Sequence, residues 1–152
     1  MAKDGYILSI DQGTTSSRAL IFNDNGEILS QKNYEFTQLY PKSGWVEHDP
    51  IEILDTTIKA IKFVIADSKI DPKDITVAGI TNQRETVVVW DKNSGKPIHN
   101  AIVWQDRRTE EICEKFRLDG LSETIIKKTG LIIDPYFSGT KIKWILENVP
   151  DA

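Results

Sequence analysis

An amphipathic helix pattern followed directly by a short β-branched segment constrains this fold more than any other feature of the sequence. Asp49-Pro50 is a typical helix start, and apolar residues then recur every three or four positions, at Ile51, Leu54, Ile58, Ile61 and Ile65. Residues 75–80 are too short and too β-branched for a second helix and indicate a buried strand. A strand that follows a helix is expected to join its sheet by a crossover, parallel to an earlier strand.

Three strand-like segments precede this helix. Residues 6–10 and 18–22 are mostly apolar and are separated by a polar turn, and residues 27–36 alternate partly between apolar and polar. The Asn25-Gly26 pair between the last two segments is a strong hairpin signal. The sequence therefore predicts an antiparallel meander, followed by a loop from Thr37 to His48.

Beyond residue 80 the elements are shorter. Strands are expected at 86–90 and 101–104, and the pattern becomes helical from Asp106, which is expected near a helix start. Gly130 is expected to end one helix and Ser138 to cap the last. In that last helix the residues expected to point inward are Ile142, Ile145 and Leu146. The whole chain predicts one α/β domain.

Composition excludes several classes of protein. Hydrophobic residues make up 39% and charged residues 28%, as in ordinary soluble domains. The net charge is −4 without a basic run, which argues against nucleic acid and anionic membranes as partners. No stretch approaches the ~20 apolar residues of a membrane-spanning helix. The single cysteine, Cys113, cannot form an internal disulfide, so a cytoplasmic location is expected.

The order β-β-β-α-β, with a turn-rich loop between the first two strands, matches the core of the ribonuclease-H-like fold. Actin, the heat-shock ATPases and the sugar kinases share this fold. The expected fold class is therefore α/β of the ribonuclease-H-like (actin/sugar-kinase ATPase) type. Element order alone does not determine a function.

The polar stretch at 11–18, Asp-Gln-Gly-Thr-Thr-Ser-Ser-Arg, is the first candidate site. Asp11 ends a buried strand, from which its carboxylate can reach a metal ion or an attacking group. Gly13 permits a tight turn, so that backbone N–H groups and the three hydroxyl residues after it can face one anion. Arg18 adds a charge suited to phosphate. An ordinary hairpin loop is the competing interpretation, and a Walker A loop is excluded because no Gly-Lys-Ser/Thr ends the stretch.

A second polar patch, residues 81–85, follows the strand at 75–80. If the chain turns there, Arg84 and Glu85 can point into one cleft and offer donors and acceptors to a neutral polyol; a surface ion pair is the alternative. Trp104 can lay its face against the C–H edge of a small ligand or fill the core. Tyr136 can offer its phenol to a ligand or plug the core.

Four segments in this order resemble the FGGY family of carbohydrate kinases, and the resemblance covers the whole chain. They are residues 11–18, 82–91, 100–109 and 136–145. Members of this family are two-domain chains of about 500 residues. The resemblance thus implies that residues 1–152 are the N-terminal part of the first of two domains, an incomplete N-terminal FGGY kinase domain.

The resemblance also implies an activity, the ATP-dependent phosphorylation of glycerol to sn-glycerol 3-phosphate, with ATP and Mg²⁺ as cofactors. It places glycerol on four residues, Arg84, Glu85, Trp104 and Tyr136. It places the nucleotide phosphates on another four, Thr14, Thr15, Ser16 and Arg18. Asp11 is expected at the metal and attacking-oxygen end of the site.

The family's general base and adenosine pocket lie in segments that would follow residue 152. The chain of residues 1–152 is therefore expected to be inactive by itself, and the complete enzyme is expected to be a homo-oligomer. Two other functions stay open: another FGGY kinase acting on a pentose or other polyol, and an actin-like or heat-shock-like ATPase without small-molecule kinase activity. The second shares the strand order but not the segments 82–86 or 104–109.

Overall fold

The computed structural model describes residues 5–150 and residue 152, and the chain divides into two compact units. Unit 1 contains residues 5–37 and 51–83, and unit 2 contains residues 38–50 together with the described residues from 84 onward. The assignment of residues 1–152 to a single domain stays a prediction.

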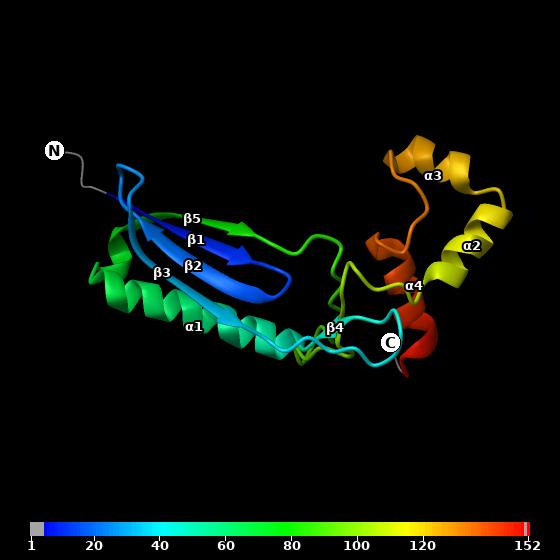
Figure 1. The fold of residues 1–152 in the computed structure, drawn as a ribbon, viewed down its shortest axis with the longest axis horizontal. Helices are drawn as coiled ribbons and strands as arrows, with labels where there is room; N and C mark the ends of the chain where they lie inside the picture. The colour runs from blue at the N-terminus through cyan, green and yellow to red at the C-terminus, as the bar shows by residue number, and fades with distance from the viewer. Residues whose placement is uncertain (1–4, 151) are drawn as a thin grey trace. The chain divides into compact units, whose positions relative to one another are not determined.

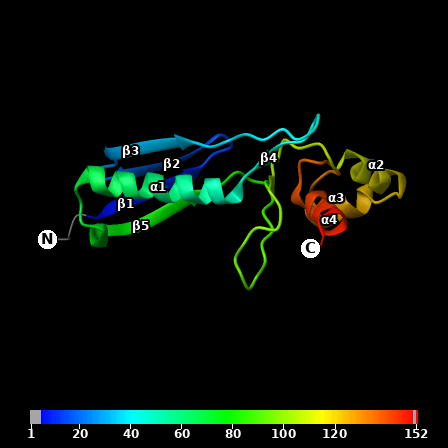
Figure 2. The ribbon, with the colours of Figure 1, turned by 90° about the horizontal axis from the view of Figure 1, so that it is seen from below.

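Unit 1 is a four-stranded mixed sheet with one long helix along one face (Figures 1 and 2). The strands lie in the order β3-β2-β1-β5, and their bounds are β1 Tyr6–Gln12, β2 Ser16–Phe22, β3 Ile28–Glu35 and β5 Ile75–Thr81. The first three strands are antiparallel, and β5 is parallel to β1. Both the predicted meander and the predicted crossover are confirmed. The helix, α1 (Pro50–Ser68), begins at the predicted Pro50, and a short 3-10 helix, Pro72–Asp74, leads into β5.

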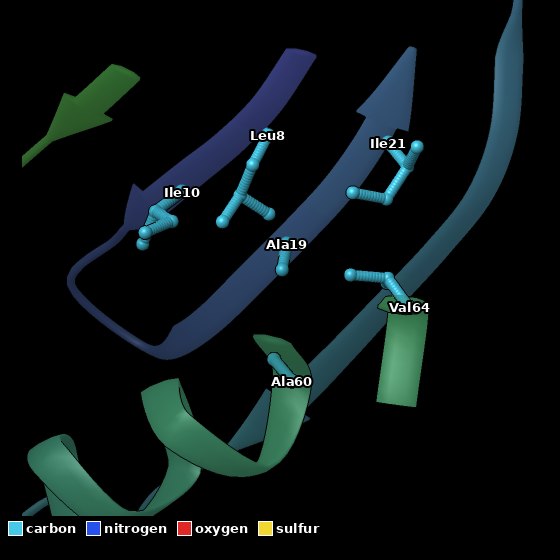
Figure 3. Close-up of a cluster of buried hydrophobic side chains, with 6 residues drawn as sticks. All are labelled: Leu8, Ile10, Ala19, Ile21, Ala60 and Val64. Atoms are coloured by element: carbon cyan, nitrogen blue, oxygen red, sulfur yellow. The ribbon is translucent and has the colours of Figure 1, made fainter. Parts of the chain in front are cut away.

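The core of unit 1 lies between the sheet and α1 (Figure 3). Its buried side chains are Leu8, Ile10, Ala19 and Ile21 from the sheet and Ala60 and Val64 from the helix. Of the predicted apolar stripe, Ile61 and Ile65 pack against this core. The prediction was wrong for Ile51, Leu54 and Ile58, which are exposed. The small side chains of Ala60 and Val64 face the sheet instead, so the buried face of α1 is rotated away from the N-terminal part of the stripe.

Unit 2 combines a two-stranded antiparallel sheet with three helices. The sheet pairs β4 (Glu47–His48) with β6 (Ala101–Ile102). The helices are α2 Glu110–Leu118, α3 Ser122–Thr129 and α4 Ser138–Asn148 (Figure 1, yellow to red). Its hydrophobic core is built on Val87, Ile102 and Ile145.

Several sequence predictions for unit 2 were wrong. The predicted strand 86–90 forms only isolated bridges, at Val87 and Trp90, and the strand predicted at 101–104 is limited to β6. Strand β4 lies inside the predicted loop 37–48. This strand has only two residues, Glu47 and His48, and both side chains are polar and buried. Two such residues show no hydrophobic periodicity from which a strand could be predicted.

The helices of unit 2 also differ in part from expectation. Gly130 ends α3 in the left-handed conformation, with φ of 73°, as predicted. Asp106 does not open a helix, because α2 begins only at Glu110. In α4 only Ile145 of the three predicted inward residues is buried, whereas Ile142 and Leu146 are exposed. None of the helices in the described part of the chain is long and apolar enough to cross a membrane.

Candidate functional site

The turn between β1 and β2 carries the first predicted site. Its closing hydrogen bond runs from the backbone N–H of Gly13 to the carbonyl of Ser16, at 3.0 Å. A Cβ atom at Gly13 would lie 3.2 Å from that same carbonyl oxygen, so a side chain here would press on the turn. Thr14 and Thr15 form the tip of the turn, and the backbone N–H of Phe36 donates to the Thr15 carbonyl at 3.3 Å. The turn is therefore compact and tied to the chain that follows β3.

Asp11 and Arg18 form an ion pair at the base of this turn. They lie directly opposite each other on β1 and β2, and Arg18 Nη2 donates to Asp11 Oδ2 at 2.5 Å. Both side chains keep solvent access, with 31% of Asp11 and 50% of Arg18 exposed. The pair is thus a surface pair that a stronger anion or a cation can reorganise.

An open depression of about 550 Å³ lies over this end of the sheet. Three of the predicted phosphate and metal residues line it, namely Asp11, Ser16 and Arg18. The other two, Thr14 and Thr15, lie in the turn and do not belong to its lining. The structure thus gathers part of the predicted set around one opening.

Strand β3 adds residues to the lining of this depression that the sequence did not single out. They are Gln31, Lys32 and Asn33, and Asn33 lies directly opposite Arg18 in the register of β2 and β3. Lys32 lies opposite the core residue Ala19, so its side chain is on the helix side of the sheet, where its ammonium is 4.7 Å from the ring centroid of Phe63. The meander predicts that β3 neighbours β2, but the register that places Asn33 beside Arg18 depends on the hairpin geometry and cannot be read from residue types.

A polar cluster beneath the turn joins it to α1. Ser17 and Thr57 both donate to Gln12 Oε1, at 2.9 and 2.6 Å, and the Ser17 hydroxyl lies 2.9 Å from that of Thr56. Ser17 itself is buried. These bonds fix Gln12, the residue after Asp11, from the helix side of the sheet.

The second predicted site lies in unit 2, and its centre is Glu85. The chain turns at Arg84 and Glu85, and Glu85 has a positive φ of 66°, which is uncommon for a residue with a Cβ atom. Glu85 Oε2 accepts hydrogen bonds from the backbone N–H and the hydroxyl of Ser138, at 2.8 and 2.7 Å. The expected role of Ser138 as the cap of α4 was wrong: Ser138 is the first helical residue, and the carboxylate of Glu85 bonds the helix end in its place.

Arg84 is exposed, and no hydrogen bond or ion pair joins it to Glu85 among the described residues. The alternative of a surface ion pair between these two side chains therefore does not hold. The guanidinium of Arg84 can therefore donate hydrogen bonds to a ligand. The second carboxylate oxygen of Glu85 can accept one.

Trp104 and Tyr136 lie edge to face, with ring centroids 5.9 Å apart and an interplanar angle of 70°. The backbone N–H of Trp104 is placed by the hydroxyl of Thr86, at 3.3 Å. Asp134 Oδ1 accepts from the backbone N–H of Tyr136 at 2.8 Å, and the ring of Phe137 lies edge to face with that of Tyr136, with centroids 5.1 Å apart. Both rings are half-buried, so each keeps a face or edge toward solvent.

The charged residues after Trp104 build the scaffold of unit 2. The guanidinium of Arg108 is buried, pairs with Asp106 and Glu47, and lies 3.8 Å from the ring centroid of Trp45. Asp106 Oδ2 also accepts from the backbone N–H of Val46, at 2.6 Å. These contacts lock the segment after β6 against the segment that carries β4.

Metal binding in the described part of the chain depends on the donor groups that its side chains bring together. Among the described residues, no group of three or more His, Cys, Asp or Glu side chains is placed to hold a metal ion. Asp11 offers one carboxylate at the depression. A single carboxylate suits Mg²⁺ when nucleotide phosphates and water supply its other ligands, so Asp11 fits a nucleotide-bound Mg²⁺ and not a protein cage.

Comparison with known families matches residues 6–152 to the N-terminal domain of the FGGY family of carbohydrate kinases. The chain belongs to this FGGY family. Its sequence is 61% identical to the glycerol kinase of Thermoanaerobacter sp. over 100% of the chain and 30% of that protein. It is 60% identical to glycerol kinase 2 of Thermotoga maritima over 95% of the chain and 29% of that protein. The chain thus spans about 30% of the length of the curated relatives it matches.

Solved structures of FGGY kinases share the fold. The crystal structure of Plasmodium falciparum glycerol kinase with ADP matches with a TM-score of 0.89 at 40% identity, over 97% of this chain and 30% of that chain. The gluconate kinase of Lactobacillus acidophilus matches with a TM-score of 0.85 at 24% identity, over 95% of this chain and 29% of that chain, and shows the fold alone. The predicted fold class is confirmed: the structure is mixed α/β, of the type shared by actin and the sugar kinases.

Proposed function

We propose that this chain is the N-terminal part of a glycerol kinase, which transfers a phosphoryl group from ATP to glycerol and forms sn-glycerol 3-phosphate. The observation that carries the proposal is the cluster of Glu85, Trp104 and Tyr136, which the segment 134–138 joins in unit 2. The similarity to glycerol kinases along the whole chain supports the same substrate.

The cluster offers what a small polyol needs. The free carboxylate oxygen of Glu85 accepts a hydroxyl hydrogen, whereas the guanidinium of Arg84 and the phenol of Tyr136 donate to hydroxyl oxygens. The indole of Trp104 supplies an apolar surface for the carbon chain. A neutral triol has both kinds of group, so donors and acceptors are matched without a net charge in the site.

The phosphates of ATP are assigned to the depression of unit 1 and to the β1–β2 turn, two residues of which, Gly13 and Ser16, line it. The hydroxyls of Thr14, Thr15 and Ser16 and the guanidinium of Arg18 are donors suited to phosphate oxygens. Phosphoryl transfer depends mostly on positioning and on stabilising negative charge spread over the transferred group. Arg18 would exchange its bond to Asp11 for bonds to a phosphate.

Mg²⁺ bound to the nucleotide would be held from the protein side by Asp11, and it would neutralise phosphate charge. Asp11 orients toward the depression because it is the last outward-facing residue of β1 before the turn. The family's general base is proposed to lie outside residues 1–152, since the charged residues after Trp104 are engaged in the scaffold of unit 2.

Homo-oligomerisation and a cytoplasmic location also stay proposals. Cys113, the only cysteine of the sequence, is a buried free thiol, which suits a reducing compartment. Size-exclusion chromatography with light scattering tests the oligomeric state.

The test uses the complete protein that carries residues 1–152 at the length of its relatives, called the full-length enzyme below. ADP release is measured with ATP and Mg²⁺, with and without glycerol, and with a panel of pentoses, gluconate and other polyols. Glycerol-dependent release, with glycerol preferred by kcat/KM, is expected. A preference for a pentose would favour another FGGY kinase, and ADP release independent of any small alcohol would favour an ATPase of the actin or heat-shock type.

A further inference from the structure

Lys141 is a buried cation to which the proposed reaction assigns no role. It lies on α4 and has no exposed surface. Its ammonium donates to three successive backbone carbonyls, those of Pro135 at 2.7 Å, Tyr136 at 2.5 Å and Phe137 at 3.4 Å. An ammonium has three donors, and here all of them are used on one short segment.

Burying this charge is unfavourable for the fold. Burial lowers the pKa of Lys141 to about 8, against the opposing influence of the nearby carboxylates. The hydrogen bonds go to carbonyl oxygens, so the carboxylates of Glu85, Asp106 and Asp134 favour the charge only from a distance and offset part of the lost hydration. Lys143, two residues further along α4, shows the ordinary alternative, a surface pair with Glu147. The role of the buried ammonium of Lys141 is therefore to be found in the segment that it binds.

The segment it holds is the one that presents Tyr136. Asp134 Oδ1 fixes the backbone N–H of Tyr136 from one side, and Glu85 Oε2 fixes Ser138 from the other. Lys141 binds the carbonyls between these two anchors. Without the ammonium, the three carbonyls would lose this donor, and the segment would have to shift for them to find water or other donors.

We infer that Lys141 is a positioning residue of the polyol site: it holds the carbonyls of residues 135–137 so that the Tyr136 ring stays against Trp104 and the start of α4 stays on Glu85. The inference rests on the proposed function and deepens it. Lys141 does not touch the substrate. It fixes the spacing between the phenol, the indole and the carboxylate, and this spacing selects a ligand as short as a triol.

The test compares Lys141→Met with the matched control Lys143→Met in the full-length enzyme. Methionine matches the apolar stem of lysine up to its fourth side-chain atom and removes all three donors. The glycerol KM of Lys141→Met is expected to rise about tenfold to a hundredfold, because a displacement of about 1 Å in a binding group has effects of this size. The KM for ATP is expected to stay within about twofold, and Lys143→Met is expected to match the wild type. Thermal unfolding establishes that each variant is folded.

A double variant tests whether Lys141 acts through Tyr136. Tyr136→Ala alone is expected to raise the glycerol KM, and adding Lys141→Met is expected to raise it less than Lys141→Met does in the wild type, because residues that act through one another are not additive. Two independent, multiplying effects would overturn the inference.

If Lys141→Met does not fold, Lys141→Arg decides. The guanidinium keeps the charge and the donors, so the segment is expected to shift less than in Lys141→Met. It still shifts, because a guanidinium extends further than an ammonium, and a severalfold rise in glycerol KM at unchanged ATP KM is expected. If Lys141→Met folds and has the wild-type glycerol KM, the inference is overturned and the proposed function stands. The same holds for Lys141→Arg if only that variant folds. A wild-type enzyme that does not phosphorylate glycerol overturns the proposed function before any variant is compared.

Discussion

Glu85 binds the first residue of α4 twice, since its Oε2 accepts both the backbone N–H and the hydroxyl of Ser138, at 2.8 and 2.7 Å. These bonds occupy one oxygen of the carboxylate. The other oxygen is left as an acceptor, on a residue whose φ of 66° is held by the surrounding structure. Glu85 is thus both an anchor of the 134–138 segment and a candidate contact for a substrate hydroxyl.

Replacing Glu85 therefore separates these two roles. In the full-length enzyme, Glu85→Ala is expected to raise the glycerol KM by about 5- to 150-fold, because a buried hydroxyl that loses its acceptor costs about 1–3 kcal/mol. The ATP KM is expected to stay nearly unchanged. Ser138→Ala removes only the hydroxyl bond and is expected to have a smaller effect. Steady-state kinetics with each substrate varied provide the measurement, and an unchanged glycerol KM in Glu85→Ala would remove this residue from the site.

Arg18 and Thr14 are expected to act on turnover and on nucleotide handling. Groups that stabilise charge developing on the transferred phosphoryl affect rate more than ground-state binding. Arg18→Ala is expected to lower kcat by about 100- to 1,000-fold, the usual effect of losing one such donor, with glycerol KM little changed. Thr14→Ala is also expected to lower kcat.

Lys62→Ala, at an exposed position of α1, serves as the control for both variants. Wild-type kcat and wild-type ATP KM in Thr14→Ala would refute the assignment of the turn to phosphate binding. A loss of glycerol affinity without loss of kcat in Arg18→Ala would contradict it as well.

The outcome for unit 1 shows what residue patterns can predict. The meander and the crossover follow from local signals, such as Asn25-Gly26 and the helix start at Pro50, and both are present in the structure. The exposed positions of Ile51 and Ile58 were not predictable from spacing alone, because the small Ala60 allows a different face of α1 to approach the sheet.

Unit 2 depends on contacts between residues that are far apart in the sequence, and here local patterns fail. Ser138 looks like a helix cap, but a carboxylate 53 positions earlier takes that role. Arg108 pairs with Glu47, which is 61 positions earlier. This pairing allows an arginine and a glutamate, residue types that usually lie at the surface, to be buried. Lys141 belongs to the same class: a lysine on an amphipathic helix predicts exposure, and only the fold reveals the three carbonyls around it.

The buried Lys141 predicts a specific dependence of stability on pH. The folded protein releases this proton near pH 8, whereas the unfolded chain holds it up to the ordinary lysine pKa of 10.5. Between these values the unfolded chain binds more protons, so the free energy of unfolding rises with pH, by at most ~1.4 kcal/mol per pH unit from this group. The melting temperature of the wild type relative to Lys141→Met is therefore expected to increase between pH 7.5 and pH 9.5.

Cys113 acts in the opposite direction, because burial raises the pKa of its thiol above 9.0. A group with a raised pKa loses stabilisation as the pH rises; because Cys113 is present in both proteins, only the part of its effect that depends on its charge interaction with Lys141 remains in the difference. Scanning calorimetry of the full-length enzyme and its Lys141→Met variant at the two pH values gives the comparison. A difference in melting temperature that does not vary with pH would show that Lys141 does not titrate in this range.

Residues 1–152 by themselves are expected not to phosphorylate glycerol. The reaction needs a base near the attacking hydroxyl, a pocket that holds ATP in line and a closure that excludes water. The chain offers phosphate donors around Arg18 and polyol contacts around Glu85. Asp11 is the carboxylate of the phosphate depression, where it pairs with Arg18, and in the proposed reaction it would be a ligand of Mg²⁺ and not the base.

The purified 152-residue chain and the full-length enzyme are compared in a coupled ADP-release assay with glycerol, ATP and Mg²⁺. Circular dichroism with a cooperative melting transition establishes that the shorter chain is folded, so that inactivity has a chemical meaning. Glycerol binding by the short chain, followed by the fluorescence of its tryptophans, is expected to be weaker than in the full-length enzyme, because its polar groups stay hydrated. Glycerol-dependent turnover above background would mean that the base lies within residues 1–152, and Asp11 would then be the first residue to replace, by asparagine, because its carboxylate lines the phosphate depression.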